Sequence, residues 1–188
     1  MPELVATPGQ TIGPFFGCVL PYPEDRELLS RGSAGSVRLH GYVYDGEGRG
    51  VEDALLEIRQ ADASGAVPVV PGSLRRGGAP FTGWGRSSTG PDGHYWFSTV
   101  EPGPTWPGST PFVVVAVFAR GLLNRLFTRI YLPAGPAVLD ADPLLSSLDA
   151  AGRRAMVAMR EADGSLRFDV HLQGPRENPF LTFPGHLR

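Results

Sequence analysis

The chain has 188 residues, 41% of them hydrophobic, and a formal net charge of −2. This length is enough for one domain with a substantial core, and the lack of a basic block argues against nucleic acid or an anionic membrane surface as a partner. The 25 glycines and 19 prolines are scattered without a period, which excludes collagen and indicates many turns between short strands.

The single cysteine, Cys18, excludes an internal disulfide and fits a reducing compartment. The first residues carry neither the positive charge nor the apolar run of a signal peptide. No run approaches the roughly 20 apolar residues of a membrane-spanning helix. We therefore expect a cytoplasmic protein.

Residues 1–35 are expected to form an N-terminal arm with a short helix that packs on a partner chain. Residues 7–16 combine prolines and glycines, which oppose helix and regular strand, with the large apolar side chains of Ile12, Phe15 and Phe16. An arm that lies extended on another chain satisfies both features, whereas a poorly ordered terminus is the alternative. Within this arm, residues 23–30 allow one helical turn.

Residues 36–188 are expected to form a single β-sandwich domain. Residues 37–44 alternate, with Val37, Leu39 and Val43 on one face and polar or aromatic side chains on the other, which predicts a half-buried strand. Turn signals separate this run from the next ones. The other expected strands cover residues 55–60, 94–100, 112–118, 125–132, 155–161 and 166–172.

Residues 112–118 are the most apolar run of the chain, without a polar interruption, and most of them are β-branched or aromatic. This composition favours a strand over a helix. An unbroken apolar run predicts a central strand that is buried on both faces. The run is followed by Arg120, which is either a surface charge just past the core or a charge directed into a pocket.

Residues 72–90 are expected to form a long glycine-rich loop, of a length that is uncommon unless it lines a site or an interface. A short helix is expected between Asp142 and Gly152. Asp142 and Pro143 are typical of a helix N-cap and first helical residue, and Gly152 is typical of the residue at which a helix ends. Together these patterns predict an all-β protein, an antiparallel β-sandwich with long loops and one or two short helices.

The residues taken alone reveal no credible active site. The spacing of a metal site is absent among the four histidines, which are His40, His94, His171 and His186. The nucleophile-elbow and phosphate-loop motifs are also absent. Tyr42 and Tyr44 lie on the polar face of a strand, where tyrosines usually provide amphipathic cover. An iron site built from these tyrosines and two histidines stays open as an alternative.

Several short segments follow one another in an order that is typical of one family. They are Thr7-Pro8-x-Gln10-Thr11-x-Gly13-Pro14, Gly41-x-Val43-Tyr44-Asp45-Gly46, Leu56-Glu57-x-x-Gln60-Ala61-Asp62-Ala63-x-Gly65, Thr99-Val100-x-Pro102-Gly103, Phe118-Ala119-Arg120-Gly121 and Thr128-Arg129-x-Tyr131. A weaker match covers the final hairpin. These segments resemble the intradiol ring-cleavage dioxygenases, and among them the alpha chains of the heteromeric enzymes that act on protocatechuate. The resemblance implies a β-sandwich of the intradiol dioxygenase type.

The resemblance also implies where a metal would lie. Family members hold a mononuclear Fe(III) with two tyrosines and two histidines, which the catalytic beta chain carries in the heteromeric enzymes. Counted from the matching segments, these ligand positions fall on Val67, Thr105, Phe112 and Val114. Valine and phenylalanine have no lone pair for iron, and a threonine hydroxyl is a poor substitute for a phenolate. The chain is therefore expected to hold no metal and no catalytic residue, and its former ligand positions are expected to have become hydrophobic core.

What the resemblance assigns to this chain is one wall of a substrate pocket whose iron lies in the beta chain. The residues that carry over are Thr11, Gly13, Pro14 and Arg120. Arg120 would form a charge-assisted pair with the carboxylate of protocatechuate, and Thr11 would donate one more hydrogen bond. Gly13 would allow close approach of the backbone, and Pro14 would supply a stiff apolar wall.

The implied function is that of a non-iron-binding alpha subunit. It would assemble with a homologous beta chain into (alpha-beta)n units, in which Fe(III) and O2 cleave the catechol ring between its hydroxyls and give 3-carboxy-cis,cis-muconate. This chain alone would be inactive. The alternative is a free-standing, non-catalytic β-sandwich binding module derived from the same fold.

Overall fold

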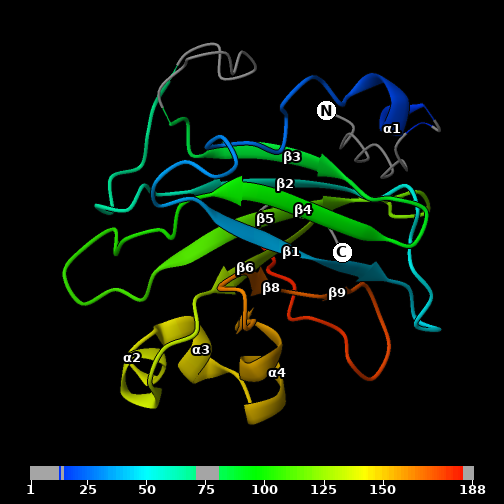
Figure 1. Cartoon of the computed structure of the whole chain (residues 1–188). Coiled ribbons are helices and arrows are strands. Elements are labelled where there is room, and N and C mark those ends of the chain that lie inside the picture. Colours follow the sequence, from blue (N-terminus) through cyan, green and yellow to red (C-terminus); the bar gives the residue numbers. More distant parts are fainter. Residues whose placement is uncertain (1–12, 14, 71–80, 184–188) are drawn as a thin grey trace, which may run out of the picture.

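Two β-sheets packed face to face form the core of the chain, and α2–α4 lie together at one end of them, away from α1 (Figure 1). The computed structural model describes residue 13, residues 15–70 and residues 81–183. One sheet contains β1 (Val37–Tyr44), β4 (His94–Thr99), β7 (Met159–Arg160), β8 (Leu166–Arg167) and β9 (Val170–His171). The other contains β2 (Leu55–Gln60), β3 (Trp84–Ser88), β5 (Phe112–Phe118) and β6 (Leu126–Tyr131). The predicted β-sandwich is confirmed.

The strands with the clearest sequence patterns lie where the sequence predicts them. Strands β1, β2 and β5 have the predicted bounds. In β1, Leu39 and Val43 point into the sandwich, and they meet Leu56 and Ile58 from β2 of the other sheet. Alternation with a period of two therefore places one row of side chains in the core on each strand.

The prediction that β5 is buried on both faces is wrong. Its burial alternates along the strand, so that Val113, Val115 and Val117 are buried while Phe112 and Val114 are partly exposed. The strand is central in its sheet, between β2 and β6, but a two-layer sandwich covers a sheet on one face only. The second apolar row of β5 consequently lies on the outer face of the sheet.

The long loop expected over residues 72–90 contains a strand. Residues 71–80 lie outside the described part of the chain, but β3 pairs with the edge of β2 from Leu55↔Ser88 to Arg59↔Trp84. The segment Trp-Gly-Arg-Ser-Ser has little intrinsic strand propensity, which is why the sequence pattern does not reveal it. At Gly85 the packing is close, because an added Cβ would make the end of the Leu28 side chain shift.

The N-terminal region has its own short helix, α1 (Phe16–Val19), and then crosses the open edge of the sandwich. The backbone N–H of Leu28 donates to the carbonyl of Ser98 in β4 (2.9 Å), and that of Arg86 in β3 donates to the carbonyl of Asp25 (2.8 Å). This part of residues 1–35 therefore packs on the sandwich of its own chain. Packing of the preceding residues on a partner stays a prediction.

Four short helices occur in the described residues, where the sequence predicts one or two. The helix expected from Asp142 to Gly152 is split into α3 (Pro143–Ser147) and α4 (Ala150–Ala155), and α2 (Pro136–Asp140) precedes them. Leu148 divides α3 from α4 because its backbone is extended. None of the helices in the described ranges has the length and apolar character needed to cross a membrane.

The α2–α4 helices cover a second, smaller core built on Tyr131, Leu145 and Met156. The Asp142 side chain accepts hydrogen bonds from the backbone N–H groups of Leu144 (2.9 Å) and Leu145 (3.1 Å), which confirms its predicted role as N-cap. This second core fixes the helices to the end of the sandwich at which β6 finishes.

The final segment keeps the predicted alternation, with Leu166, Phe168 and Val170 buried between more exposed neighbours. Its pairing differs from the expected simple hairpin. Strands β8 and β9 are short and run parallel to β1, while only β7 pairs antiparallel with β8. The returning chain thus adds to the far side of β1 rather than forming a separate ribbon.

Candidate functional site

Arg120 lies just after β5 and its side chain is 56% exposed. Its Nε forms an ion pair with the carboxylate of Asp53, in the turn that leads into β2. Thr89 fixes that turn, because its hydroxyl donates to the carbonyl of Val51 (2.7 Å) and accepts from the N–H of Ala54 (2.9 Å). A guanidinium has five N–H donors, so a contact through Nε leaves donors for a second anion. Arg120 is thus a partly fixed cation at the edge of the sheet.

Arg120 does not lie at the positions where the family has its metal ligands. Phe112 is at the start of β5 and Arg120 is two residues past its end. The seven residues of β5 that separate them span roughly 23 Å, which exceeds the size of a small aromatic acid several-fold. One small molecule therefore cannot contact Arg120 and the Phe112 end of β5 within this chain.

Of the four former ligand positions, only Thr105 has a side-chain oxygen, and the four have not all become hydrophobic core as expected. Val67 is 51% exposed and Thr105 is exposed, while Phe112 and Val114 are partly buried on the outer face of β5. The expectation is therefore wrong for Val67 and Thr105, whereas Phe112 packs against the second core under helices α2–α4. Among the described residues, no group of three or more His, Cys, Asp or Glu side chains is arranged to hold a metal ion.

A hydrogen-bonded chain of side chains occupies the surroundings of Phe112. The Arg129 guanidinium lies 4.1 Å from the centroid of the Phe112 ring and donates to the Tyr131 hydroxyl (3.1 Å). The Tyr131 hydroxyl in turn donates to the carboxylate of Asp142 (3.0 Å). Arg129 therefore has a structural role, because it connects the outer face of the sheet to the N-cap of α3.

Burial is the main cause that raises the pKa of Tyr131 to about 12. The Asp142 carboxylate raises this pKa further, while Arg129 lowers it. The phenol is therefore neutral at physiological pH, as a hydrogen-bond donor to Asp142 requires. Its oxygen is already engaged by Arg129 and Asp142.

Of the residues expected in the substrate pocket, Gly13 and Arg120 lie in the described part of the chain, whereas Thr11 and Pro14 lie outside it. Gly13 is exposed, and an added Cβ there would meet no atom within 4 Å. The close approach expected at Gly13 is not made by this chain itself.

The alternative iron site of tyrosines and histidines does not have the geometry of a metal centre. The rings of Tyr42 and Tyr44 stack with centroids 5.8 Å apart, and those of Tyr44 and His171 stack at 5.0 Å. His94 meets the Tyr42 ring at 5.1 Å, edge to face. Stacked rings present their faces to one another, whereas metal ligation needs in-plane nitrogen and oxygen lone pairs that converge on one point. This row of rings covers the outer face of the β1 sheet.

Two histidines of this row are kept neutral by their surroundings. Burial is the main cause that lowers the pKa of His94, and the nearby Arg38 lowers it further. Burial also lowers the pKa of His171, with a smaller contribution from Arg176. Neutral imidazoles stack on tyrosine rings without the cost of burying a charge, which fits a packing role.

Sequence reasoning missed Asp53, the partner of Arg120. The two residues are far apart in sequence, and neither belongs to a recognisable motif with the other. The signal that could have found Asp53 is the pairing of β2 with β5. Its last pair is Leu55↔Phe118, so extending both strands by two residues places Asp53 opposite Arg120.

Comparisons with known proteins point to one family. No family model matches the chain. It is 37% identical over 197 residues to the protocatechuate 3,4-dioxygenase alpha chain of Burkholderia cepacia, covering 96% of this chain and 99% of the relative. It is 32% identical over 200 residues to the alpha chain of Pseudomonas putida, covering 96% and 98%. The beta chain of the Burkholderia cepacia enzyme is 28% identical over 161 residues, covering 74% of this chain and 65% of the relative.

Solved structures agree on the fold. The dioxygenase domain of a carbohydrate-binding fusion protein from Streptomyces sp. SirexAA-E is 27% identical, with a TM-score of 0.59 and coverage of 89% of this chain and 98% of that one. Hydroxyquinol 1,2-dioxygenase from Pseudomonas putida DLL-E4 is 18% identical, with a TM-score of 0.57 and coverage of 88% and 66%, which supports the fold alone. With near-complete coverage of two alpha chains above 30% identity, the chain belongs to the protocatechuate 3,4-dioxygenase alpha-chain family of intradiol ring-cleaving dioxygenases.

Proposed function

We propose that this chain is the non-iron-binding subunit of a protocatechuate 3,4-dioxygenase and completes the substrate pocket of a homologous beta chain. The observation that carries the proposal is that the former metal-ligand positions and the proposed carboxylate-binding arginine lie far apart within the chain. The former metal-ligand positions hold Val67, Thr105, Phe112 and Val114, whereas the one cation that fits the substrate, Arg120, lies at the other end of β5. A pocket that uses Arg120 therefore needs its reactive centre from another chain.

The residues of this chain do not fit Fe(III). None of the four positions offers an imidazole or a phenolate, and Tyr131 near Phe112 is a neutral phenol engaged with Asp142. Iron in the complex is therefore assigned to the beta chain, which supplies the chemistry that cleaves the ring between its two hydroxyls with O2 and yields 3-carboxy-cis,cis-muconate. The proposal assigns no chemical step to this chain.

Arg120 is proposed to bind the substrate carboxylate. A forked, charge-assisted pair of this kind contributes about 1.5–3 kcal/mol, or roughly tenfold to hundredfold in affinity. Asp53 holds the guanidinium through Nε and leaves other N–H donors for the carboxylate. Thr11, Gly13 and Pro14 are proposed to line the same pocket, with a hydrogen bond from Thr11 and close contacts from Gly13 and Pro14.

The surface of the chain supports burial against a partner. Phe15 and Val19, at either end of α1, are each 74% exposed. The outer row of β5 adds partly exposed Phe112 and Val114. Exposed large apolar side chains that gather in patches mark interaction surfaces. We propose that the N-terminal arm and this outer row pack on the beta chain in (alpha-beta)n units, and that the complex works in the cytoplasm.

The free-standing binding module is not favoured. The chain matches alpha chains over 96% of its length and also matches a beta chain, so both partners of a two-chain enzyme are among its relatives. Co-expression with a candidate beta chain tests the proposal. We expect the two chains to co-purify and to turn over protocatechuate, while this chain alone does not. A stable, inactive monomer that does not bind a beta chain from the same organism would contradict the proposal.

A further inference from the structure

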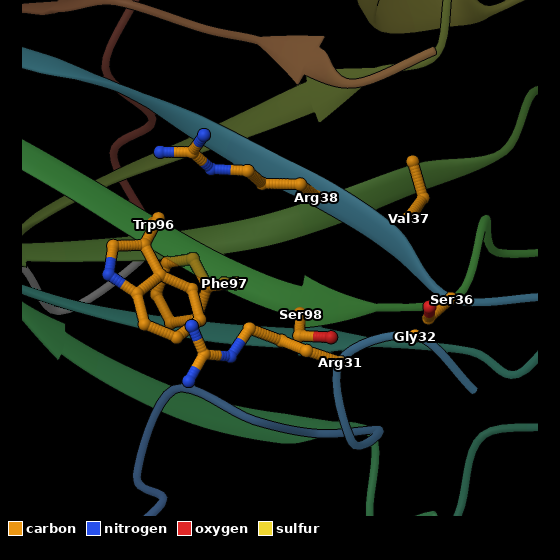
Figure 2. A pocket seen from close by; sticks show the side chains of 8 residues that line it. All are labelled: Arg31, Gly32, Ser36, Val37, Arg38, Trp96, Phe97 and Ser98. Atoms are coloured by element: carbon orange, nitrogen blue, oxygen red, sulfur yellow. The ribbon is translucent and has the colours of Figure 1, made fainter. Parts of the chain in front are cut away.

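A pocket on the outer face of the β1–β4 pair lies on the opposite sheet from Arg120 and β5. It has a volume of about 530 Å³ and is lined by side chains from the segment after Arg31, from the start of β1 and from the end of β4 (Figure 2). Pockets of 300–1,000 Å³ suit small organic ligands. Figure 2 shows the guanidinium groups of Arg31 and Arg38 extending from different elements toward the Trp96 side chain.

Arg31 is held in place by its neighbours. Its guanidinium carbon lies 5.0 Å from the centroid of the Trp96 ring, and its Nε donates to the Glu27 carboxylate (3.0 Å). Arg26 approaches the same ring at 5.1 Å and pairs with Asp25. Cation–π contacts restrict both long side chains, so Arg31 presents its remaining N–H donors to the pocket with less loss of rotamer freedom.

Arg38 supplies a charge without a close carboxylate partner. It is exposed and forms no ion pair with any residue in the described ranges. In the same ranges, Arg26 and Arg31 each have a carboxylate partner, Asp25 and Glu27. Arg38 interacts with the Asp163 carboxylate only at longer range, so its guanidinium keeps its N–H donors for an occupant of the pocket.

Ser98 supplies a polar group that lacks a partner. It stands opposite Arg38 in the β1–β4 register, and 97% of its surface is buried, since only 3% is exposed. The backbone N–H and carbonyl of Ser98 are both hydrogen-bonded, but its hydroxyl lines the pocket without a hydrogen bond to any described residue. The hydroxyl oxygen is not among the fully buried unpaired atoms of the described residues, so it is accessible from the pocket and able to bond an occupant.

The two features specify the kind of occupant. The Arg38 guanidinium, which lacks an ion-pair partner among the described residues, and the Ser98 hydroxyl together favour an oxygen-rich anion, for which arginine offers a forked set of donors. A second guanidinium reaches the pocket from another element, which suits a ligand with anionic groups at two places. We propose that this pocket binds a small organic dicarboxylate, with Arg38 and Arg31 on its two carboxylates and Ser98 donating to one of them.

The site is independent of the proposed function, because none of its residues belongs to the Arg120 pocket or to β5. Its test is isothermal titration of adipate, a flexible dicarboxylate that lacks a catechol diol, into the purified full chain. We expect one adipate per chain, with an affinity that falls at least tenfold in Arg38→Ala and falls less in Ser98→Ala. Added salt should weaken binding because the charges are near the surface.

Arg160→Ala is the matched control, since Arg160 is another exposed arginine, pairs with Glu101 and does not line the pocket. It should bind adipate as the unmodified chain does. Equal affinity in Arg38→Ala and the unmodified chain, or equal losses in Arg38→Ala and Arg160→Ala, would overturn the proposal. It would also be overturned if Arg38→Ala left adipate binding unchanged but weakened association with a second chain in sedimentation velocity, since a partner's carboxylate would then occupy the pocket.

Discussion

Arg120 and Asp53 lie opposite each other just beyond Leu55↔Phe118, the last pair of the β2–β5 ladder, and their side chains form an ion pair. Pairing two residues past that last pair keeps both side chains on one face of the sheet. An ion pair this exposed adds about 0–1 kcal/mol to folding stability. The main effect of this ion pair is therefore to fix the position of the Arg120 guanidinium.

Arg120→Ala should impair recognition of the substrate carboxylate. We expect the KM for protocatechuate in the complex to rise about tenfold to hundredfold, because a charge-assisted pair is lost. The KM for catechol, which has no carboxylate, should change little. Steady-state kinetics on both substrates measures this. Arg49→Ala, an exposed arginine that pairs with Asp45, is the control. Unchanged kinetics in an intact Arg120→Ala complex would exclude the proposed role.

Asp53→Asn should act through Arg120. The amide keeps the size of the side chain but loses the charge that holds Nε, so we expect a smaller rise in the KM for protocatechuate, roughly twofold to fivefold. The decisive measurement is the double-mutant cycle with Arg120→Ala. If Asp53 positions Arg120, the double variant should match Arg120→Ala alone. Fully additive effects would show that Asp53 acts independently.

Tyr131→Phe should destabilise the fold without altering its surface. The change removes the hydroxyl that accepts from Arg129 and donates to Asp142, both of which remain in place. Loss of a buried hydrogen-bond partner costs about 1–3 kcal/mol. Chemical denaturation at neutral pH should show this loss. A variant as stable as the unmodified chain would mean that the Arg129–Tyr131–Asp142 chain is not a stabilising element.

The contribution of Tyr131 to stability should decrease at alkaline pH. Its pKa is about 12 in the folded chain and 10 as its ordinary value. Because the folded state disfavours the phenolate, this contribution to stability is complete below pH 10 and is lost as the pH rises toward 12. The difference in unfolding free energy between the unmodified chain and Tyr131→Phe should therefore shrink across that window. A difference that stays constant from pH 9 to pH 12 would contradict the assignment.

Neighbouring residues of β5 should respond in opposite ways to a charge. Val114 is partly exposed on the outer face, whereas Val115 is fully buried between the sheets. We expect Val114→Asp to leave the chain folded but weaken co-purification with the beta chain. Val115→Asp should unfold it, because an unpaired charge in the core is strongly unfavourable. Circular dichroism and size-exclusion chromatography separate the two outcomes. Normal assembly of Val114→Asp would remove the outer row of β5 from the interface.

The sequence predicted strands where one pattern dominates. The alternation of β1 and the apolar run of β5 fix the bounds of these strands because few other structures fit them. It did not predict β3, whose glycine and serines form a strand only because the edge of β2 is available to pair with. Composition also could not show that the second apolar row of β5 faces outward. That depends on how many layers cover the sheet.

The candidate site was predictable only in part. The resemblance singled out Arg120, but Asp53 follows from the strand register, which is a tertiary property. The pocket at Trp96 likewise joins residues from the segment around Arg31, from β1 and from β4, which no local motif connects. Thr11 and Pro14 lie outside the described residues, so their place in the substrate pocket stays a prediction.

The central claim is that this chain shapes a neighbour's cavity and does not hold the reactive metal. Metal analysis of the two chains, separated after co-purification of an active complex, tests it most directly. We predict that iron in the active complex matches the amount of beta chain, and that this chain, expressed alone, takes up no stoichiometric iron and shows no tyrosinate-to-iron absorption band. Stoichiometric ferric ion bound by this chain alone would contradict the account.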